Sequence, residues 1–327
     1  MNNADCYWNV SIGWRKGSMQ SDRPQHHRRK MPNDQTEAHA SFSNVDDVQR
    51  WAIASILKLG KRVAPRGMGT IELAPFTFTL SNPRRRCTEQ PERRWSKALA
   101  FGEFLWHAAA SDDAAALEYY ARPWAEFAVD GRILGSCYGK SIFEQTWQRK
   151  SQWSRLINLL KSDPHSRRAV LDFRVSGGDV LNSPDIACVS SLQFLIRDGR
   201  LNALAVLRSN DVIWGLPYDL FVLTMFQEMA AQELGLDVGW YNHHVASMHI
   251  YERHIDLARQ ILAGAEFASS EMQPLGDISE LPDVISAERD IRNGSVPDLS
   301  RITSKYWLEM IGVLMDFQGK KQAQSSA

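Results

Sequence analysis

The chain has 327 residues, and its 38 Lys and Arg residues equal its 38 Asp and Glu residues, so the formal net charge is zero. A chain of this length can bury a sizeable core. Charge balance excludes a global field that would recruit nucleic acid or a membrane surface. Its apolar runs are shorter than the ~20 residues needed to span a bilayer, and its first residues lack the apolar core of a secretion signal. We therefore expect a cytoplasmic protein with no membrane partner and no nucleic-acid partner.

The four cysteines, Cys6, Cys87, Cys137 and Cys188, show neither a CxxC pair nor the spacing of a metal site. In a chain this long, such cysteines indicate cytosolic thiols rather than a disulfide framework. No bound metal is expected.

Residues 1–44 are polar and irregular, with a basic cluster at 26–30. This composition cannot bury enough apolar surface to offset the entropy of ordering, which predicts a flexible tail. A nucleic-acid-binding arm is the alternative for the basic cluster. Acidic residues after Val45, followed by apolar residues at helical spacing, predict a helix that begins the ordered domain.

The central third of the chain alternates between predicted strands and helices. Strands are predicted at 70–80 and 168–175, and helices at 95–110 and 153–160. Asp198-Gly199 lies between two apolar runs, which predicts a β-hairpin within 191–209.

Residues 217–234 are apolar on nearly all sides, begin with Pro217 and end before Gly235, a pattern typical of a buried core helix. Beyond it we predict a strand at 240–251, irregular acidic chain at 270–300 and a polar tail at 319–327. Together these elements predict one α+β domain over residues 45–318, with a single large mixed β-sheet covered by helices.

Cys188 follows a turn and directly precedes the predicted hairpin. A lone cysteine between apolar neighbours is more often an inert buried thiol. Arg208, on the other arm of the hairpin, can lower the thiol pKa and supply a reactive thiolate. Arg208 and Ser209 also offer a planar donor fork and a hydroxyl, a combination suited to phosphate.

Two further cationic segments are candidate anion sites. Arg167 and Arg168 follow a predicted helix break, although a solvated surface is the simpler interpretation of this pair. Arg66 precedes Gly67, and glycine lets a backbone approach an anion closely, but short Gly-Arg loops are common.

Three other side chains are candidates for proton transfer or substrate binding. Glu103 lies among apolar neighbours, so it needs either a hidden partner or a raised pKa suited to proton transfer. His249 and Tyr251, two residues apart on a predicted strand, share a face and can hold a sugar hydroxyl, or His249 can be a core histidine.

Five ordered motifs over residues 60–262 together resemble the thymidylate synthase family. They are Leu134-Gly-Ser-Cys-Tyr-Gly-Lys140, Ser166-Arg167-Arg168, Cys188 with Gln193-Phe194, the segment Arg208-Ser209-x-Asp211-x3-Gly215-x-Pro217-x-Asp219, and His249-x-Tyr251 with His254. The resemblance implies that family's fold, in which the sheets of two subunits pack together in a homodimer.

The resemblance also implies a site for a pyrimidine nucleoside monophosphate and 5,10-methylenetetrahydrofolate. The implied catalytic residues are Cys188 as nucleophile, with Glu103, Tyr138 and Asp219. The implied nucleotide-binding residues are Arg66, Arg208, Ser209, Asp211, Asp219, His249 and Tyr251, with Arg167 and Arg168 reaching across from the partner subunit. Arg62 is an alternative to Arg66. The implied folate-binding residues are Glu103, Trp124, Asp211 and Gly215.

Three departures from the family pattern bear on the substrate and the product. Asp219 replaces an Asn that reads uracil, and a carboxyl group can accept from the cytosine amino group and donate to N3. An Asp that merely favours a helix start is the alternative. Val189 stands where uracil-using members have His. The polar C-terminal segment replaces the apolar tail that closes the family site, which favours addition of water over hydride.

These departures resemble deoxycytidylate hydroxymethylases. We therefore expect 5-hydroxymethylation of dCMP, or of CMP, with methylenetetrahydrofolate and water. C5-methylation of cytidylate with hydride from folate is one alternative. A nucleotide-binding regulator without catalysis is another, and it is disfavoured because Cys188 and Glu103 are both present.

Overall fold

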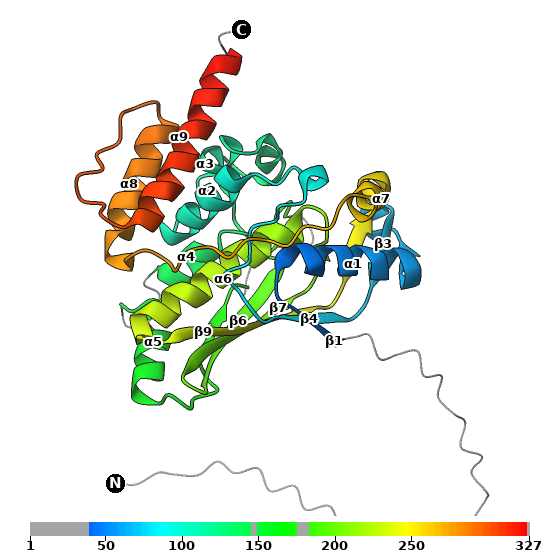
Figure 1. The fold of residues 1–327 in the computed structure, drawn as a ribbon, viewed down its shortest axis with the longest axis horizontal. Coiled ribbons are helices and arrows are strands. Elements are labelled where there is room, and N and C mark those ends of the chain that lie inside the picture. The colour runs from blue at the N-terminus through cyan, green and yellow to red at the C-terminus, as the bar shows by residue number, and fades with distance from the viewer. Residues whose placement is uncertain (1–38, 145–148, 175–182, 326–327) are drawn as a thin grey trace, which may run out of the picture. The chain divides into compact units, whose positions relative to one another are not determined.

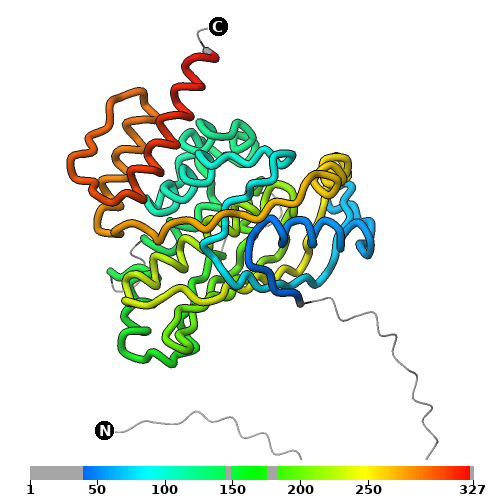
Figure 2. Tube along the Cα trace, in the orientation of Figure 1, coloured from blue at the N-terminus to red at the C-terminus, as the bar shows by residue number. Residues whose placement is uncertain are grey.

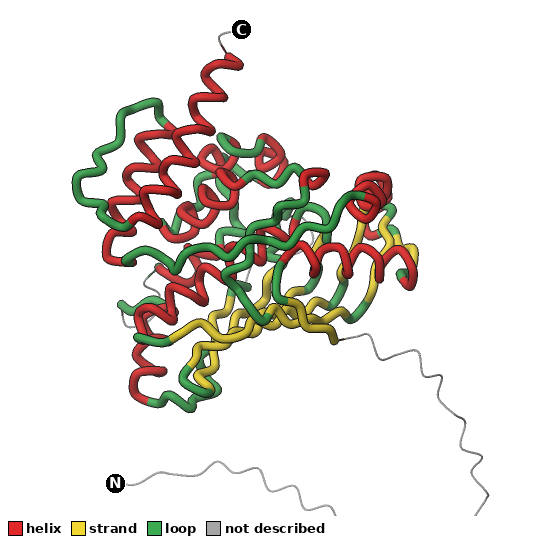
Figure 3. Tube along the Cα trace, viewed as in Figure 1, coloured by secondary structure: helices red, strands yellow, loops and turns green. Residues whose placement is uncertain are grey.

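The computed structural model describes residues 39–144, 149–174 and 183–325. Helices α1 (Val45–Leu59), α5 (Gln152–Ser162) and α6 (Gly215–Leu234) lie on one face of a six-stranded sheet, and α2 (Lys97–Ala108) packs on α6. The opposite face of the sheet carries no helix from these residues (Figures 1 and 3). The path of the chain in Figure 2 shows that the segment from about 264 to 280 returns over α6 before the last helices. Cys6, the basic cluster at 26–30 and most of the predicted tail lie outside the described residues.

The six-stranded sheet is mixed and has the order β1-β4-β9-β7-β6-β5. Its strands are β1 (His39–Phe42), β4 (Phe76–Leu80), β5 (Val170–Asp172), β6 (Val189–Arg197), β7 (Arg200–Leu207) and β9 (Asp237–Val245). The predicted hairpin is confirmed: β6 and β7 pair antiparallel, and Asp198 has a positive φ of 51° beside Gly199 at the turn. β9 then pairs parallel with β7.

The large mixed sheet that we predicted is confirmed, and it is accompanied by a second, four-stranded sheet that we did not predict, in the order β2-β3-β10-β8. It comprises β2 (Lys61–Val63), β3 (Thr70–Leu73), β8 (Asn210–Asp211) and β10 (Met248–Tyr251). The predicted strands at 70–80 and 240–251 are each divided between the two sheets. Ala74-Pro75 separates β3 from β4, and 246–247 separates β9 from β10. Because β10 pairs with β8, His249 lies opposite Asp211.

Nine α-helices are assigned within the described residues. They are α1 (Val45–Leu59), α2 (Lys97–Ala108), α3 (Ala114–Glu118), α4 (Tyr138–Phe143), α5 (Gln152–Ser162), α6 (Gly215–Leu234), α7 (Ile255–Ala263), α8 (Leu281–Arg292) and α9 (Lys305–Ser325). The predicted core helix is α6, which crosses the sheet (Figure 1) and ends where Gly235 adopts a left-handed conformation, φ 66°.

The structure corrects three boundaries. β1 lies within the predicted tail 1–44, because His39–Phe42 adds a parallel edge strand to β4. Within 270–300, α8 buries Leu281, Val284, Ala287 and Ile291, apolar positions at helical spacing in an acidic segment. The predicted tail 319–327 is helical through Ser325, because Gly319 is followed by Lys, Gln and Ala residues that favour helix.

A buried ion pair ties the loop before α2 to α6. Arg86 is 0% exposed, Glu228 is 3% exposed, and the two side chains bond directly, while Arg84 Nε donates to Glu228 Oε1 at 2.6 Å. Burial acts to raise the pKa of Glu228, but Arg86 and Arg84 hold that pKa below its usual range. This pair therefore stabilises the fold fully at pH values above the ordinary pKa of a Glu. Its contribution is lost as the pH falls through the lowered pKa of Glu228.

We predict that Glu228→Ala lowers the free energy of unfolding by about 3–5 kcal/mol, because it leaves the buried guanidinium unpaired. Urea denaturation measures the loss. Glu309→Ala, which removes an exposed partner of Lys305, is the matched control and should change stability by about 0.5 kcal/mol or less. Equal losses in the two variants would contradict the assigned role, and the double variant Arg86→Met with Glu228→Leu should recover most of the stability.

Candidate active site

Cys188 lies immediately before β6, facing the end of β7. Its carbonyl oxygen accepts from the backbone N–H of Arg208 at 2.9 Å, which continues the hairpin pairing. The thiol Sγ is 3.6 Å from Arg208 Nη2 and 3.8 Å from Ser209 Oγ. The hairpin therefore brings the predicted nucleophile, guanidinium and hydroxyl together.

The Arg208 side chain is held by the loop that leads to Cys188. Nη2 donates to the Ile186 carbonyl at 2.7 Å, Nε donates to the Ala187 carbonyl at 3.0 Å, and Nη1 donates to Ser209 Oγ at 3.0 Å. Arg208 is nevertheless exposed, so an anion can approach it.

The pKa of Cys188 is raised, which corrects our expectation of a lowered value. Burial has the largest effect, and the opposing influence of Arg208 is smaller, while Asp219 adds to the rise. The arginine thus limits the cost of forming a thiolate without making the thiol acidic.

Asp219 lies in the first turns of α6 and ends a buried chain of hydrogen bonds. Asn210 Nδ2 donates to Asp219 Oδ2 at 2.7 Å. Asn210 Oδ1 accepts from His243 Nε2 at 3.0 Å, and His243 Nδ1 accepts from the Tyr241 hydroxyl at 2.8 Å. Burial lowers the pKa of His243 to about 3, so the ring is neutral and donates in one direction only.

This chain fixes which oxygen of Asp219 can carry a proton. Burial raises the pKa of Asp219 to about 7, the Asn210 bond opposes the rise and Asp211 adds to it. Because Oδ2 accepts from Asn210, the proton of the neutral form resides on Oδ1. Asp219 is therefore an oriented carboxyl group that takes up its proton near neutral pH.

Glu103 and Tyr138 lie close to the same carboxyl group. Burial, followed by the charge of Asp219, raises the pKa of Glu103 to about 8. Burial, followed by Asp219 and Cys188, raises the pKa of Tyr138 well above its usual value. The Tyr138 hydroxyl accepts from the Val189 N–H at 3.5 Å, next to Cys188. The four predicted catalytic residues thus converge.

Asp211 and Gly215 shape the start of α6. The Asp211 carboxylate accepts the backbone N–H groups of Ile213 at 3.0 Å and Trp214 at 3.2 Å. A Cβ on Gly215 would lie 2.9 Å from Asn210 Nδ2, so glycine permits the Asn210–Asp219 contact. Both residues therefore have a structural role here, and their part in folate binding stays a prediction.

His249 and Tyr251 lie on β10, an inner strand of the four-stranded sheet, and Arg66 lies near Tyr251. The rings of His249 and Tyr251 meet edge to face, with centroids 5.0 Å apart. Arg66, at a positive φ of 53°, acts to lower the pKa of Tyr251, although burial raises that pKa overall. Arg62 instead pairs with Glu252. The structure thus favours Arg66 over Arg62 as the cation available beside Tyr251.

Arg167 and Arg168 are not brought to Cys188 by their own chain. Both are exposed just before β5, whose Val170 pairs with Gln193. From Cys188 to Gln193, β6 rises roughly 16 Å at about 3.3 Å per residue. The pair therefore lies toward the far end of the sheet.

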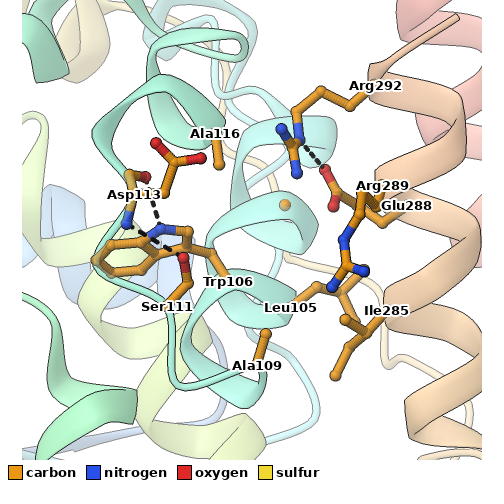
Figure 4. A pocket seen from close by; sticks show the side chains of 11 residues that line it. Leu105, Trp106, Ala109, Ser111, Asp113, Ala116, Ile285, Glu288, Arg289 and Arg292 are labelled. Atoms are coloured by element: carbon orange, nitrogen blue, oxygen red, sulfur yellow. Dashed lines mark hydrogen bonds and ion pairs between the residues drawn. The ribbon is translucent and has the colours of Figure 1, made fainter. Parts of the chain in front are cut away.

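Trp124, a predicted folate contact, packs against Trp106 at 6.5 Å and Phe127 at 5.9 Å. Trp106 also lines a cavity of about 210 Å³ between α2, α3 and α8, shown in Figure 4. The labelled residues of this cavity include none of the predicted site residues. Its buried Glu288 already accepts from Arg292 at 2.9 Å and from Tyr120 at 2.8 Å, so its main charges are satisfied.

Sequence reasoning missed four residues around this site. Asn210, His243 and His107 are buried beside the predicted residues. Only His107, a polar residue in a largely apolar helix, had a sequence signal, because Asn210 and His243 have polar neighbours in the sequence. Arg93 is 0% exposed, with its guanidinium 4.2 Å from the Trp214 ring centroid and 5.4 Å from that of Tyr218. Among the described residues, its Nε and Nη1 have no hydrogen-bond partner.

No described helix is long and apolar enough to cross a membrane. Residues 39–144, 149–174 and 183–325 also contain no group of three or more His, Cys, Asp or Glu side chains arranged to hold a metal ion.

Comparison with known proteins agrees with the motifs. A deoxyuridylate hydroxymethyltransferase of Bacillus phage SP01 is 29% identical over 212 residues, 61% of this chain and 55% of that protein. Thymidylate synthases of Bacillus licheniformis and Listeria monocytogenes are 28% and 33% identical, over 50% and 42% of this chain and 59% and 44% of their own lengths. The chain spans about half the length of these relatives. Residues 51–286 match the family model for thymidylate synthase, and the chain therefore belongs to the thymidylate synthase family.

Proposed function

We propose that this protein is a one-carbon transferase that adds a hydroxymethyl group to C5 of cytidylate, with dCMP as the first candidate and CMP as the second. 5,10-Methylenetetrahydrofolate supplies the one-carbon unit, and water supplies the hydroxyl. The observation that carries the proposal is Asp219, a buried carboxyl group oriented by Asn210 and protonated near neutral pH.

The neutral form of Asp219 matches cytosine at two atoms. Its protonated oxygen can donate to the unprotonated N3, and its other oxygen can accept from the 4-amino group. Uracil presents a donor at N3 and an acceptor at O4, so the same acid in the same orientation would set donor against donor at N3 and acceptor against acceptor at O4, each mismatch costing about 1–3 kcal/mol. The name of the phage SP01 relative makes uracil, as dUMP, the alternative to cytosine as the base.

Cys188 provides covalent catalysis in this proposal. Its thiolate adds to C6, and the electron pair of the C5–C6 bond forms the new bond from C5 to the one-carbon unit. C5 then loses its proton as tetrahydrofolate leaves, which produces an exocyclic methylene. Water adds to that methylene while the S–C6 bond breaks and returns the thiolate. Glu103 and Tyr138 lie where they can transfer the protons and orient the water.

The residues beside Asp219 suit the folate. Trp214 is 42% exposed and offers an aromatic face. The guanidinium of Arg93 lies over its ring, and the Nε and Nη1 atoms of that guanidinium have no hydrogen-bond partner in the described part of the chain. The flat heteroaromatic ring of the folate can stack on the Trp214 face. The anionic tail of the folate complements the positive charge of Arg93.

Two observations support a hydroxymethyl product. The end of α9 is engaged away from Cys188, because Lys321 donates to the Tyr119 carbonyl and lies 3.9 Å from the Tyr119 ring centroid. Figure 1 shows α9 running out past α3 to the C-terminus. Because α9 is held there, its described residues leave the site accessible to water, and the phage SP01 relative is itself named a hydroxymethyltransferase.

A homodimer would complete the phosphate site. One face of the six-stranded sheet has no described helix over it (Figures 1 and 3) and presents half-buried Leu204 and Val206. Packing two such faces together would bring Arg167 and Arg168 to the partner's Arg208 and Ser209. The distance between the arginine pair and Cys188 within one chain supports this arrangement.

The first prediction concerns the reaction. Incubation with dCMP and methylenetetrahydrofolate should yield a nucleotide heavier by CH2O and release tetrahydrofolate, as measured by mass spectrometry. Cys188→Ser should abolish turnover and retain nucleotide binding. Cys87→Ser, which changes a half-buried thiol away from the site, is the control. Gain of CH2 with dihydrofolate would indicate methylation instead. The proposal would be refuted if the protein exchanged the C5 hydrogen of no pyrimidine nucleotide.

The second prediction concerns the base. Because the neutral form of Asp219 pairs with cytosine and burial raises its pKa to about 7, dCMP binding should weaken as pH rises above 7. Asp219→Asn should remove that dependence and shift the preference toward dUMP by roughly 10- to 100-fold. Titration calorimetry measures both. Asp237→Asn, the same change at an exposed position, should alter neither the pH dependence nor the preference between the two nucleotides. If Asp219→Asn kept the wild-type pH dependence, the assignment would be contradicted.

A further inference from the structure

His107 lies one helical turn after Glu103 on α2 and is 1% exposed. Its Nδ1 accepts the backbone N–H of Gly139, at the start of α4, at 3.2 Å. Burial lowers the pKa of His107 to about 3, so the ring is neutral. Because an accepting nitrogen carries no proton, the single ring proton resides on Nε2.

That Nε2–H has no hydrogen-bond partner among the described residues. A buried donor without an acceptor is destabilising, and most such groups in proteins are paired. The nearest carboxylate atom is Glu103 Oε1, 4.0 Å away. Since His107 is neutral, this contact is no ion pair. It is a donor and an acceptor separated by about 1 Å more than a hydrogen bond.

The imidazole has little freedom to turn away. It stacks on Tyr138, with ring centroids 5.2 Å apart and an interplanar angle of 12°, and the Trp106 ring meets it edge to face with centroids 4.8 Å apart. A Cβ on Gly139 would lie 1.7 Å from the His107 carbonyl oxygen, so only glycine lets α4 approach α2 this closely. The Glu103 side chain, by contrast, can rotate about its own bonds to close the gap.

We propose that His107 is a positioning residue that donates its Nε2 proton to the ionised carboxylate of Glu103, and so holds that carboxylate in its proton-accepting form and aims it into the site. The inference rests on the proposed function, because it assigns Glu103 to proton transfer. It also links Glu103 to Tyr138, since one imidazole contacts both.

The charges around Glu103 explain why such a donor is needed. Burial and then Asp219, on α6, raise the pKa of Glu103 to about 8. Tyr218 also lies on α6, and Glu103 acts to raise the pKa of its phenol, which burial raises most. Tyr138 faces the group from α4 and remains neutral. Among the described residues no cation is placed to favour the ionised carboxylate, so a neutral N–H is the available stabilising contact.

Three substitutions separate the two nitrogens of the ring. His107→Phe keeps the ring shape and removes both polar atoms. His107→Asn retains an acceptor near the Nδ1 position for Gly139 but cannot reach Glu103. His107→Gln retains an N–H near the Nε2 position. If the contact with Glu103 matters, the Phe and Asn variants should behave alike and the Gln variant should resemble the wild type.

The ionisation of Glu103 is read by infrared spectroscopy, from the carboxyl band that disappears in Glu103→Gln. We expect its titration to move to higher pH by about one unit in His107→Phe and His107→Asn, and to stay near the wild-type position in His107→Gln. The limb of kcat/KM that rises with pH should move in the same way, because the ionised carboxylate accepts the proton. The proposal would be overturned if Glu103 titrated at the same pH in the wild type and the three variants. It would also be overturned if the titration moved by the same amount in all three variants.

A measurement on the wild type keeps the inference testable if the variants fold poorly. Nitrogen-15 NMR of labelled histidine should show His107 as the neutral Nε2–H tautomer from pH 6 to pH 9, and the Nδ1–H tautomer would overturn the proposal. Failure of the proposed function is distinguishable, because it would appear as absent C5 exchange in the wild type. The infrared titration and the tautomer require no turnover.

Discussion

Two carboxyl groups, Glu103 on α2 and Asp219 on α6, lie near each other and are largely removed from water, and the rest of the site follows from the cost of ionising them. A carboxylate removed from water must be paired, hydrogen-bonded or neutral. Here burial raises the pKa of both groups, and their mutual repulsion raises that of Glu103 further. The site therefore holds protons near neutral pH, as a reaction that moves protons on and off a pyrimidine requires.

The fold supports this arrangement through contacts that are remote in sequence. The pairing of β8 with β10 positions Asn210, and β9 supplies His243, so that one amide is fixed between a histidine and Asp219. The buried pair of Arg86 and Glu228 ties α6 to the loop before α2, the helix that carries Glu103. Displacement of either helix would change the separation of the two carboxyl groups and, with it, their protonation.

Sequence patterns predicted the local elements well and the long-range contacts poorly. The turn at Asp198-Gly199 identified the hairpin, and the hairpin register placed Arg208 beside Cys188. The effect of Arg208 on the thiol could not be predicted, because desolvation depends on all the elements that enclose Cys188. The role of Asn210 was invisible for the same reason, since its partner His243 comes from another strand. The helix α8 was missed because its apolar residues are interspersed with charges.

The central claim is that Asp219 recognises cytosine while its own carboxyl group is protonated and neutral. Proton uptake on binding tests it most directly. Calorimetric titration with dCMP at pH 8, in buffers of different ionisation enthalpy, counts the protons that the complex takes up. At this pH Asp219 is mostly ionised in the free protein, since burial raises its pKa only to about 7. The account predicts uptake of close to one proton per dCMP bound. Binding without proton uptake, or with proton release, would contradict it.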